Sequence, residues 1–181
     1  GTPIPMITGC DLPAIAREVE GRTNIPSFAV PSNGIGTYVA GAGQALRLYA
    51  ERFITSRPEK RKNAVNILGA TPLDFSVNGC VQSMARRLEK ADFTLQSVFA
   101  MSSSIDAIDK AGAAEANLVI SSVGLPAAKY LQAQFGTPYV IGAPFGDFFS
   151  PYVFDALRES IRTGAPADVL GTIAQDAPDT A

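Results

Sequence analysis

The chain has 181 residues, of which 46% are hydrophobic and 18% charged, a composition typical of a globular protein with one sizeable core or two small ones. Fifteen basic and seventeen acidic residues give a formal net charge of -2, and the basic run at 57–62 falls in a predicted linker. This balance excludes the electrostatic footprint of a protein that binds nucleic acid or an anionic membrane. The sequence shows neither an apolar run near the roughly 20 residues of a spanning helix nor a signal peptide, so we expect a cytoplasmic location.

Histidine is absent, and cysteine occurs only as Cys10 and Cys80. The missing histidine removes the usual general base, the usual zinc ligand and the usual partner of a nucleophilic serine or cysteine. Most hydrolase and zinc-enzyme functions are therefore excluded for this chain. Two cysteines cannot form a disulfide framework, and in a reducing compartment we expect both to be free thiols.

The first 62 residues alternate between short apolar segments and helical patterns. They predict a strand at 3–8, a helix at 11–20, a strand at 26–30 and a long helix at about 36–54. Since two strands do not easily enclose a core of their own, we expect residues 1–62 to be a partial α/β domain whose remaining strands lie elsewhere. The chain begins with Gly1 in place of methionine, and we expect it to be a piece of a longer protein.

From residue 63 onward, strands and amphipathic helices alternate regularly. Strands are expected at 64–69, 93–101, 116–121 and 138–142, and helices at 77–90, from Ser103 or Ser104 to about 114, and at 125–135. This alternation predicts a Rossmann-like or flavodoxin-like parallel sheet with helices on both faces. We assign residues 63–146 to that domain, and 147–181 to a C-terminal helix at about 151–163 followed by a tail that we expect to be mobile beyond about 172.

Cys10 lies in the sequence Thr8-Gly9-Cys10-Asp11, where a predicted strand gives way to a helix. Backbone N–H groups and the helix dipole favour a thiolate at such a junction, so a metal-binding or reactive cysteine would function here. The alternative is packing, because free cysteine is among the most frequently buried residue types. Cys80, at the start of another predicted helix, is open to the same two interpretations.

Ligands of open parallel sheets bind beyond the carboxyl ends of the strands, which here means residues 69–79, 101–104, 121–125 and 144–149. The candidate cofactor-binding residues in these segments are Ser102, Ser103, Ser104, Ser121, Ser122 and Gly124. Their hydroxyl and N–H groups could hold an anion, and helix capping is the simpler alternative. No residue is identified as catalytic.

Glycines precede and enter the predicted helix at 36–54. The turn Ser32-Asn33-Gly34-Ile35-Gly36 lacks the Gly-x-Gly-x-x-Gly spacing of a dinucleotide-binding loop, so we interpret it as a tight turn. Gly41 and Gly43 fall inside the helix, where we expect close helix packing to offset the cost of glycine.

Six segments, taken in order, resemble the nitrogenase component 1 family, which includes the dark-operative protochlorophyllide and chlorophyllide reductases and cofactor-assembly scaffolds. The segments are Thr8-Gly9-Cys10, Ile25-Pro26-Ser27-Phe28-Ala29-Val30-Pro31 with the turn that follows it, Val65-Asn66-Ile67-Leu68-Gly69, Ser102-Ser103-Ser104-Ile105, Ala116-Asn117-Leu118-Val119-Ile120 and Phe135-Gly136-Thr137-Pro138-Tyr139. The resemblance extends over most of residues 4–146.

The resemblance implies that Cys10 is one of three cysteines that a subunit contributes to an iron-sulfur cluster at a subunit interface, the other two lying upstream of Gly1. One cysteine cannot hold a cluster, so the isolated fragment is expected to carry none and to be inactive. Two features depart from the family: residues 12–18 lack its glycine and paired acidic residues, and Ser121 stands where nitrogenase has a cysteine ligand of its molybdenum-iron cofactor. Serine is a poor ligand for soft metals, which indicates a nitrogenase-like protein and not a nitrogenase.

Two functions remain open. The first is the catalytic component of a nitrogenase-like oxidoreductase, which receives electrons from an ATP-dependent iron-sulfur reductase and works beside a homologous subunit on a small-molecule substrate or metallocofactor. Its cleft would be lined by residues 69–76, 102–104 and 121–124. The second is a non-catalytic cofactor-assembly scaffold or small-ligand binding module on the same fold, with both cysteines buried as packing residues.

Overall fold

The computed structural model describes residues 3–32, 34–77 and 79–171, apart from the side chains of Pro3 and Met6. Its centre is a five-stranded sheet in the order β2-β1-β3-β4-β5, and every neighbouring pair is parallel. The strands are β1 (Ala64–Leu68), β2 (Thr94–Val98), β3 (Ala116–Val119), β4 (Tyr139–Ile141) and β5 (Ala167–Asp168). This order is the flavodoxin-like one, with its switch point between β1 and β3, and it confirms the predicted fold class.

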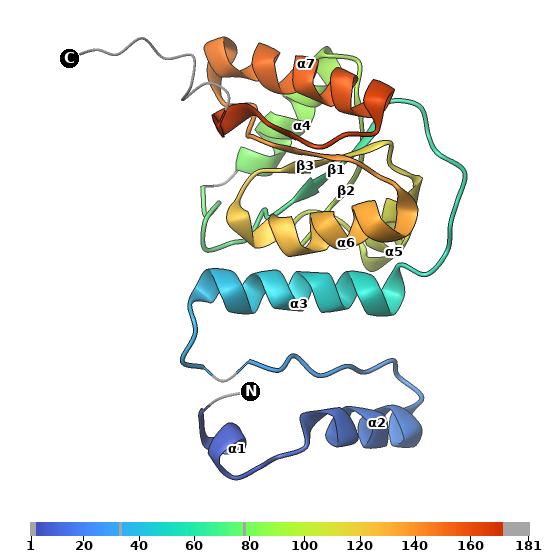
Figure 1. Cartoon of the computed structure of the whole chain (residues 1–181), viewed down its shortest axis with the longest axis vertical. Helices are drawn as coiled ribbons and strands as arrows, with labels where there is room; N and C mark the ends of the chain where they lie inside the picture. Colours follow the sequence, from blue (N-terminus) through green and yellow to red (C-terminus); the bar gives the residue numbers. More distant parts are fainter. Residues whose placement is uncertain (1–2, 33, 78, 172–181) are drawn as a thin grey trace, which may run out of the picture.

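Helices cover both faces of the sheet (Figure 1). The helices of the described residues are α1 (Pro3–Ile7), α2 (Leu12–Thr23), α3 (Tyr38–Phe53), α4 (Cys80–Lys90), α5 (Ile105–Asp109), α6 (Leu125–Phe135) and α7 (Gly146–Thr163), with 3-10 turns at Ala111–Ala113 and Ser122–Gly124. Of these, α1 and α2 lie beyond α3, away from the sheet. Helices α4 and α7 enclose one core, which includes Ile67, Met84 and Leu157. Helices α6 and α3 enclose the other, with Leu68 and Leu131. Among the described residues, no helix is both long and apolar enough to cross a membrane.

A ladder of buried polar side chains crosses β2, β1 and β3. The Ser97 hydroxyl donates to Asn66 Oδ1 at 2.7 Å, and Asn66 Nδ2 donates to Asn117 Oδ1 at 2.8 Å and to the Ala111 carbonyl at 3.0 Å. Asn117 Nδ2 reaches the Thr137 carbonyl at 3.4 Å. Asn66 is paired with Ser97 on β2 and with Asn117 on β3 in the strand register. Because an unpaired buried amide is costly, the ladder favours this register over any slipped one.

The predicted strands at 3–8 and 26–30 are wrong. Residues 3–7 form helix α1, and 26–30 have no regular structure but run between α2 and α3. Proline explains much of this difference, because Pro5 suits a first helical turn while Pro26 and Pro31 cannot donate to a ladder. The described residues also offer these segments no neighbouring strand. The division of the chain at 62 and 146 stays a prediction.

Helix α3 packs against α6 through one of its two glycines. A Cβ atom on Gly43 would lie 3.1 Å from Pro126 Cγ, whereas one on Gly41 would meet nothing within 4 Å. Close packing therefore accounts for Gly43 and does not account for Gly41. Asn33 of the predicted turn, Asn78, and the tail from Thr172, which we expected to be mobile, lie outside the described residues.

The C-terminal part differs from expectation in two ways. Helix α7 begins at Gly146, five residues before the predicted start at Pro151, which lies inside the helix. Strand β5 was not predicted, because two residues carry no periodic pattern. Together, α7 and β5 bring Phe145, Phe149 and Leu170 to the carboxyl edge of the sheet.

Replacing Asn66 tests the ladder. Asn66→Ala leaves the Ser97 hydroxyl and the Asn117 amide without this partner in a buried site, and we expect a loss of about 1–3 kcal/mol in the free energy of unfolding, measured in urea. Gln96→Ala is the control, because Gln96 is a partly exposed polar residue next to Ser97 and should change stability by no more than about 0.5 kcal/mol. Equal losses in the two variants would contradict a stabilising role for the ladder.

Candidate functional site

The switch point between β1 and β3 is closed by direct backbone contact. Gly69 has φ +91°, and a Cβ atom on it would lie 2.6 Å from Ser121 Oγ. A Cβ atom on Gly124 would lie 2.6 Å from the carbonyl carbon and oxygen of Leu68. Ser121 Oγ donates to the Gly69 carbonyl at 2.8 Å. The crevice in which a flavodoxin-like fold usually holds its ligand is therefore occupied by the protein itself.

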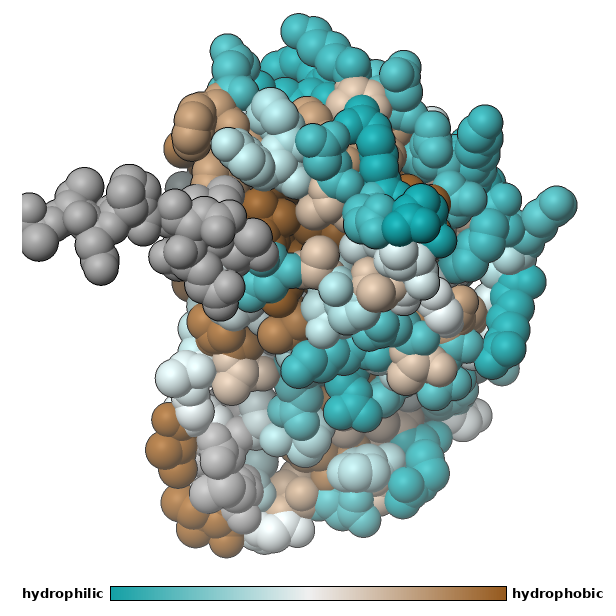
Figure 2. Space-filling model, turned by 45° about the horizontal axis from the view of Figure 1, so that its top comes forward, coloured by the Kyte–Doolittle hydropathy of each residue, from teal (hydrophilic) through white to brown (hydrophobic). Residues whose placement is uncertain are grey.

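The pocket opens one strand further along, at the carboxyl ends of β3 and β4. Its volume is about 660 Å³. It is lined by Val119, Ile120, Ser121, Ser122, Leu125, Ile141, Gly142, Ala143, Phe145, Phe149 and Leu170. We call these residues the apolar pocket. Phe145 and Leu170 are 50% and 55% exposed, so the pocket opens to the surface between them. Figure 2 shows apolar residues gathered on the left side of that view.

Charge pairing holds the α7 wall of the apolar pocket in place. Arg87 of α4 donates to Asp147 Oδ1 at 2.8 Å and to the Gly146 carbonyl at 3.2 Å. The hydrogen bond from Arg87 lowers the pKa of the Asp147 carboxyl, so this carboxylate stays ionised to a lower pH than a free aspartate does. The Phe145 ring also stacks at a tilt against Phe75, with ring centroids 6.4 Å apart.

A polar groove adjoins the apolar pocket at Ser122 and Leu125, which line both. This groove lies between α3 and α6, has a volume of about 570 Å³ and includes Arg47, Glu51, Lys129, Tyr130 and Gln134. Arg47 donates through Nε and Nη2 to Glu51 Oε1, at 2.9 and 2.6 Å. Burial, and then the Glu51 carboxylate, raises the pKa of Tyr130. Ser122 is thus the boundary between an apolar and a charged environment.

The predicted serines are divided between two places. Ser121 and Ser122 line the apolar pocket, and Gly124 lies behind it against Leu68. Residues 102–104 follow β2, at the edge of the sheet, and do not line the pocket. The Ser103 hydroxyl accepts from the Val98 amide at 2.8 Å, and the Ser104 hydroxyl caps α5 by accepting from the Ala107 amide at 3.2 Å. Hydrogen bonds to the backbone thus engage both of these hydroxyls.

Cys10 lies at the surface in the turn between α1 and α2. Its amide donates to the Pro5 carbonyl at 2.9 Å, and Asp11, which follows it, caps α2 by accepting from the Ala14 amide at 2.9 Å. Cys80 is half-buried and packs against the core beneath α4. Packing therefore accounts for Cys80 but not for Cys10. Among the described residues, no three His, Cys, Asp or Glu side chains gather into a metal-binding group.

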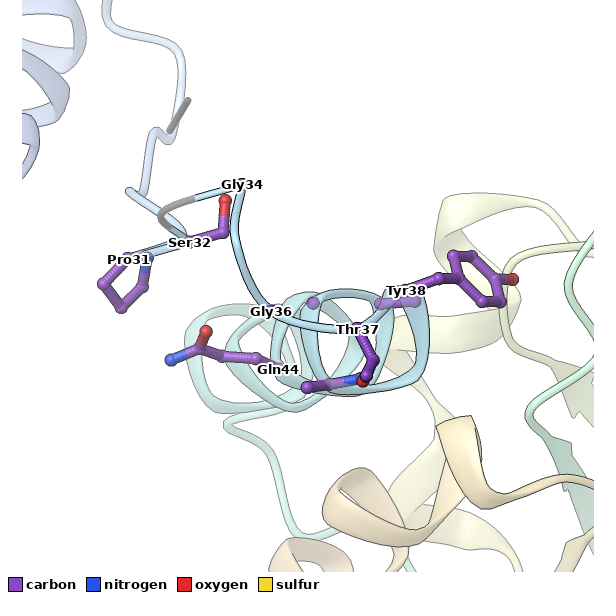
Figure 3. Close-up of a pocket in the computed structure, with 10 residues that line it drawn as sticks. Pro31, Ser32, Gly34, Gly36, Thr37, Tyr38 and Gln44 are labelled. Carbon is purple, nitrogen blue, oxygen red and sulfur yellow. The ribbon is translucent and has the colours of Figure 1, made fainter. Parts of the chain in front are cut away.

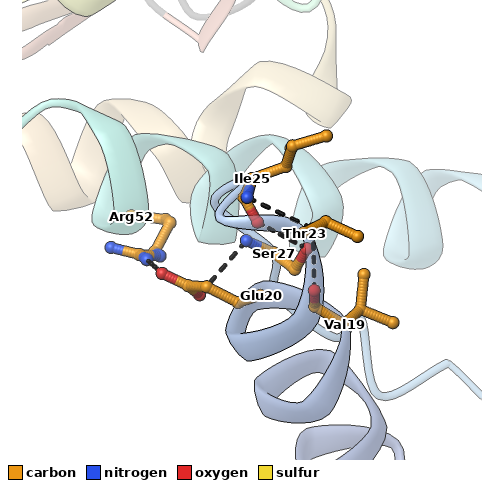
Figure 4. A network of polar contacts seen from close by, with 6 residues as sticks. All are labelled: Val19, Glu20, Thr23, Ile25, Ser27 and Arg52. Atoms are coloured by element: carbon orange, nitrogen blue, oxygen red, sulfur yellow. Dashed lines mark hydrogen bonds and ion pairs between the residues drawn. The ribbon is translucent and has the colours of Figure 1, made fainter.

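Glu20 fastens α2 to α3 (Figure 4). Its carboxylate accepts from Arg52 Nη2 at 2.5 Å and from the Ser27 amide at 3.2 Å. The Ser27 amide, and then Arg52, lowers the pKa of Glu20. The ring of Phe28 adds an edge contact to Phe53, with centroids 5.9 Å apart. Because α2 has no buried residue of its own, these contacts carry much of its attachment and so position Cys10.

A hollow of about 460 Å³ lies at the start of α3, lined by residues between Pro31 and Gln44 (Figure 3). Tyr38 points away from it, and its hydroxyl donates to Thr71 Oγ1 at 2.5 Å, which in turn donates to Asp74 Oδ2 at 3.0 Å. Thr37 caps the helix by accepting from the Ala40 amide at 3.2 Å. These contacts connect the start of α3 to the loop after β1.

The chain is similar to proteins of one family. A family model described as nitrogenase component 1 type oxidoreductase matches residues 2–169. The B subunit of light-independent protochlorophyllide reductase from Nostoc punctiforme is 34% identical over 86 residues, which are 47% of this chain and 17% of that protein. Its counterpart from Chloroflexus aggregans is 32% identical over 120 residues, 66% of this chain and 22% of that protein.

Two solved structures share the fold. They are named Nitrogenase Cp1 at pH 6.5 and at pH 5, with TM-scores of 0.72 and 0.71 and 21% identity in both cases. Each covers 97% of this chain, which in turn spans 35% and 37% of the two nitrogenase chains. These matches confirm the resemblance predicted from the sequence. At 21% identity, the two solved structures support the fold alone.

Gly124→Ala tests the closed switch point. The added methyl group has no space beside Leu68, so we expect a loss of about 1–3 kcal/mol in the free energy of unfolding, measured in urea. Gly41→Ala is the control, because its Cβ atom meets nothing and alanine favours a helix by about 1 kcal/mol. A Gly124→Ala variant as stable as the starting protein would show that the two strand ends are not in contact.

Glu20→Gln tests the attachment of α2. A carboxylate with a lowered pKa contributes stability above its unfolded pKa, and that contribution is lost as the pH falls through its folded value. We therefore expect lower protection of the α2 amides at neutral pH in Glu20→Gln, and lower protection in the unchanged chain as the pH falls through the folded pKa of Glu20, where protection is the intrinsic exchange rate at each pH divided by the observed rate. Glu18→Gln is the control, because Glu18 pairs with Arg22 inside the same helix. Equal exchange in the two variants would refute the attachment through Glu20.

Proposed function

The chain belongs to the nitrogenase component 1 type oxidoreductase family, and we propose that it is part of the catalytic component of a nitrogenase-like oxidoreductase. Its substrate binds in the apolar pocket, and electrons arrive through an iron-sulfur cluster that Cys10 helps to hold. The observation that carries this proposal is the exposed thiol of Cys10 at the start of α2, in a chain matched by the family model over residues 2–169.

Cys10 fits the role of one cluster ligand. Thiolate sulfur is the donor that iron-sulfur clusters require, and such clusters supply one-electron transfer. The described residues form no complete ligand group, so the other ligands belong to further cysteines of the protein or to a companion subunit. Asp11 and Glu20 hold α2, and with it the backbone around Cys10, in a defined place.

Ser121 does not suit the role of a ligand to the metallocofactor of nitrogenase. Serine is a poor ligand for soft metals, and the hydroxyl already donates to the Gly69 carbonyl. This supports an oxidoreductase that acts on an organic small molecule. The curated relatives point the same way, since their name describes the reduction of protochlorophyllide.

The proposal includes partners and a location. The partners are a homologous component 1 subunit and an ATP-dependent iron-sulfur reductase as the electron source, and the relatives are themselves named as one subunit of their enzyme. The free thiols of Cys10 and Cys80 favour a reducing compartment, and we place the protein in the cytoplasm. Because the chain spans 17% and 22% of two of these relatives, the activity belongs to the whole assembly.

Iron and acid-labile sulfide, measured together with visible absorption, test the cluster. The protein is purified anaerobically as it occurs in the cell, together with whatever subunits accompany it. We expect the cluster signal to be lost in Cys10→Ala and retained in Cys80→Ala, because Cys80 packs against the core and Cys10 does not. A protein free of iron in its own assembly, or a signal equally strong in both variants, would overturn the electron-transfer role and favour the scaffold or binding module.

A further inference from the structure

We propose that the apolar pocket selects an uncharged, predominantly apolar small molecule whose one polar end lies at Ser122. This inference rests on the substrate role given to the pocket above, and it names the chemical class of that substrate. It follows from the lining of the pocket, the position of the nearest charges and the residues that keep the space open.

The lining disfavours a charged group inside the pocket. Among the described residues that line the pocket, none carries a charge, and only Ser121 and Ser122 have polar side chains. A charged group placed between Ile141, Phe149 and Leu170 would lose its hydration without gaining a partner, which is strongly unfavourable. The apolar surface of a neutral ligand, by contrast, gains roughly 25 cal/mol for each Å² removed from water.

The charged groups of the surrounding elements do not line the pocket. Arg87 and Asp147 form an ion pair where α7 begins. Arg47 and Glu51 form one in the polar groove, on the far side of Ser122. Lys129 also lines that groove, and Asp168 of β5, which is paired with Ile141 in the strand register, accepts from the Gly171 amide at 3.0 Å. None of these groups lines the apolar pocket, so its walls offer a charged ligand no counter-charge.

Small residues after β4 keep the space open. Gly142 and Ala143 line the pocket without filling it. A larger residue in place of Gly142 would crowd α7, since a Cβ atom at this position would lie 3.2 Å from Val153 Cγ2. The resulting volume of about 660 Å³ is within the range of sites for small organic ligands, roughly 300–1,000 Å³. The size therefore suits a small organic molecule.

The polar end of the ligand is positioned by elimination. Ser121 uses its proton on the Gly69 carbonyl, so its hydroxyl offers a ligand only an acceptor. Ser122 is exposed and is shared with the polar groove. A ligand group that needs a hydrogen bond finds it at Ser122, next to water, while the remainder of the molecule lies against the apolar walls.

Two probes with the same rings test the charge selection directly. N-phenyl-1-naphthylamine is neutral, and 8-anilino-1-naphthalenesulfonate has the same rings with an added sulfonate. With the 181-residue chain, fluorescence titration should show saturable binding of one neutral probe per chain and at least about tenfold weaker binding of the sulfonate. Absence of neutral-probe binding, or equal affinity for both probes, would overturn the proposal.

Variants locate the bound probe. Ala143→Phe fills the pocket, and Phe145→Ser removes one wall, so each should weaken binding of the neutral probe by about tenfold or more. Phe148→Ser is the matched control, because Phe148 is another exposed phenylalanine at the start of α7 but does not line the pocket. Far-UV circular dichroism verifies that each variant folds. If Ala143→Phe fails to fold, Phe145→Ser, at a half-exposed position, still tests whether the probe binds in the pocket. Equal loss in Phe145→Ser and Phe148→Ser would place the probe elsewhere and refute the site.

This test is independent of the iron analysis. A chain that binds the neutral probe at this pocket, in a protein that carries no iron, supports the pocket and overturns only the electron-transfer role. A protein that loses its cluster in Cys10→Ala but binds neither probe retains the electron-transfer role and overturns the ligand class inferred here.

Discussion

The contact between the ends of β1 and β3 is the constraint on which the rest of the molecule depends. Asn66 and Asn117 fix the register of the two strands inside the sheet, and this register brings Gly69 against Ser121 and Gly124 at their carboxyl ends. Because the backbones touch there, the crevice at the switch point is filled. Space for a ligand is displaced by one strand, to the ends of β3 and β4, where α7 and Leu170 provide walls that the switch point lacks. The hydrogen-bonded interior thus decides where the apolar pocket can form.

Helix α3 connects the two places to which function is assigned. Near its end, Arg52 and Phe53 hold the segment that carries Cys10, through Glu20 and Phe28. At its start, Tyr38 bonds to Thr71 in the loop after β1. Along its length it packs on α6, whose first residue, Leu125, lines the apolar pocket. The position of the exposed Cys10 thiol relative to the apolar pocket is therefore set by one helix and a small number of polar contacts.

The sequence predicts those parts of the fold that depend on local patterning. Helix α6 was predicted at its observed bounds, since an apolar stripe and a following glycine define it. The apolar segments at 3–8 and 26–30 resembled strands, but a strand exists only where a partner offers its edge, and prolines removed donors that a ladder needs. The pocket was only partly foreseen. Ser121 and Ser122 were identified because polar residues directly after a strand are candidates for ligand binding. In the sequence, Ile141, Phe149 and Leu170 resemble ordinary core residues. Only the folded arrangement of β4, α7 and the unpredicted β5 places them around one pocket.

The two ends of the sheet differ in a way that bears on function. At the amino ends, Lys60 donates to the Ala114 carbonyl and to Thr137, and the Glu115 carboxylate accepts from the Asn63 amide. Burial lowers the pKa of Lys60, and the Glu115 carboxylate opposes that shift. The Lys60 ammonium group has hydrogen-bond partners at this end of the sheet. At the carboxyl ends, by contrast, large apolar side chains such as Phe145 and Leu170 stand half exposed around open space. Exposed apolar surface costs stability unless something covers it, whereas the polar groups at the amino ends already have their partners. This asymmetry favours the carboxyl edge as the place where the chain meets its ligand, which is where an α/β sheet also directs its loops.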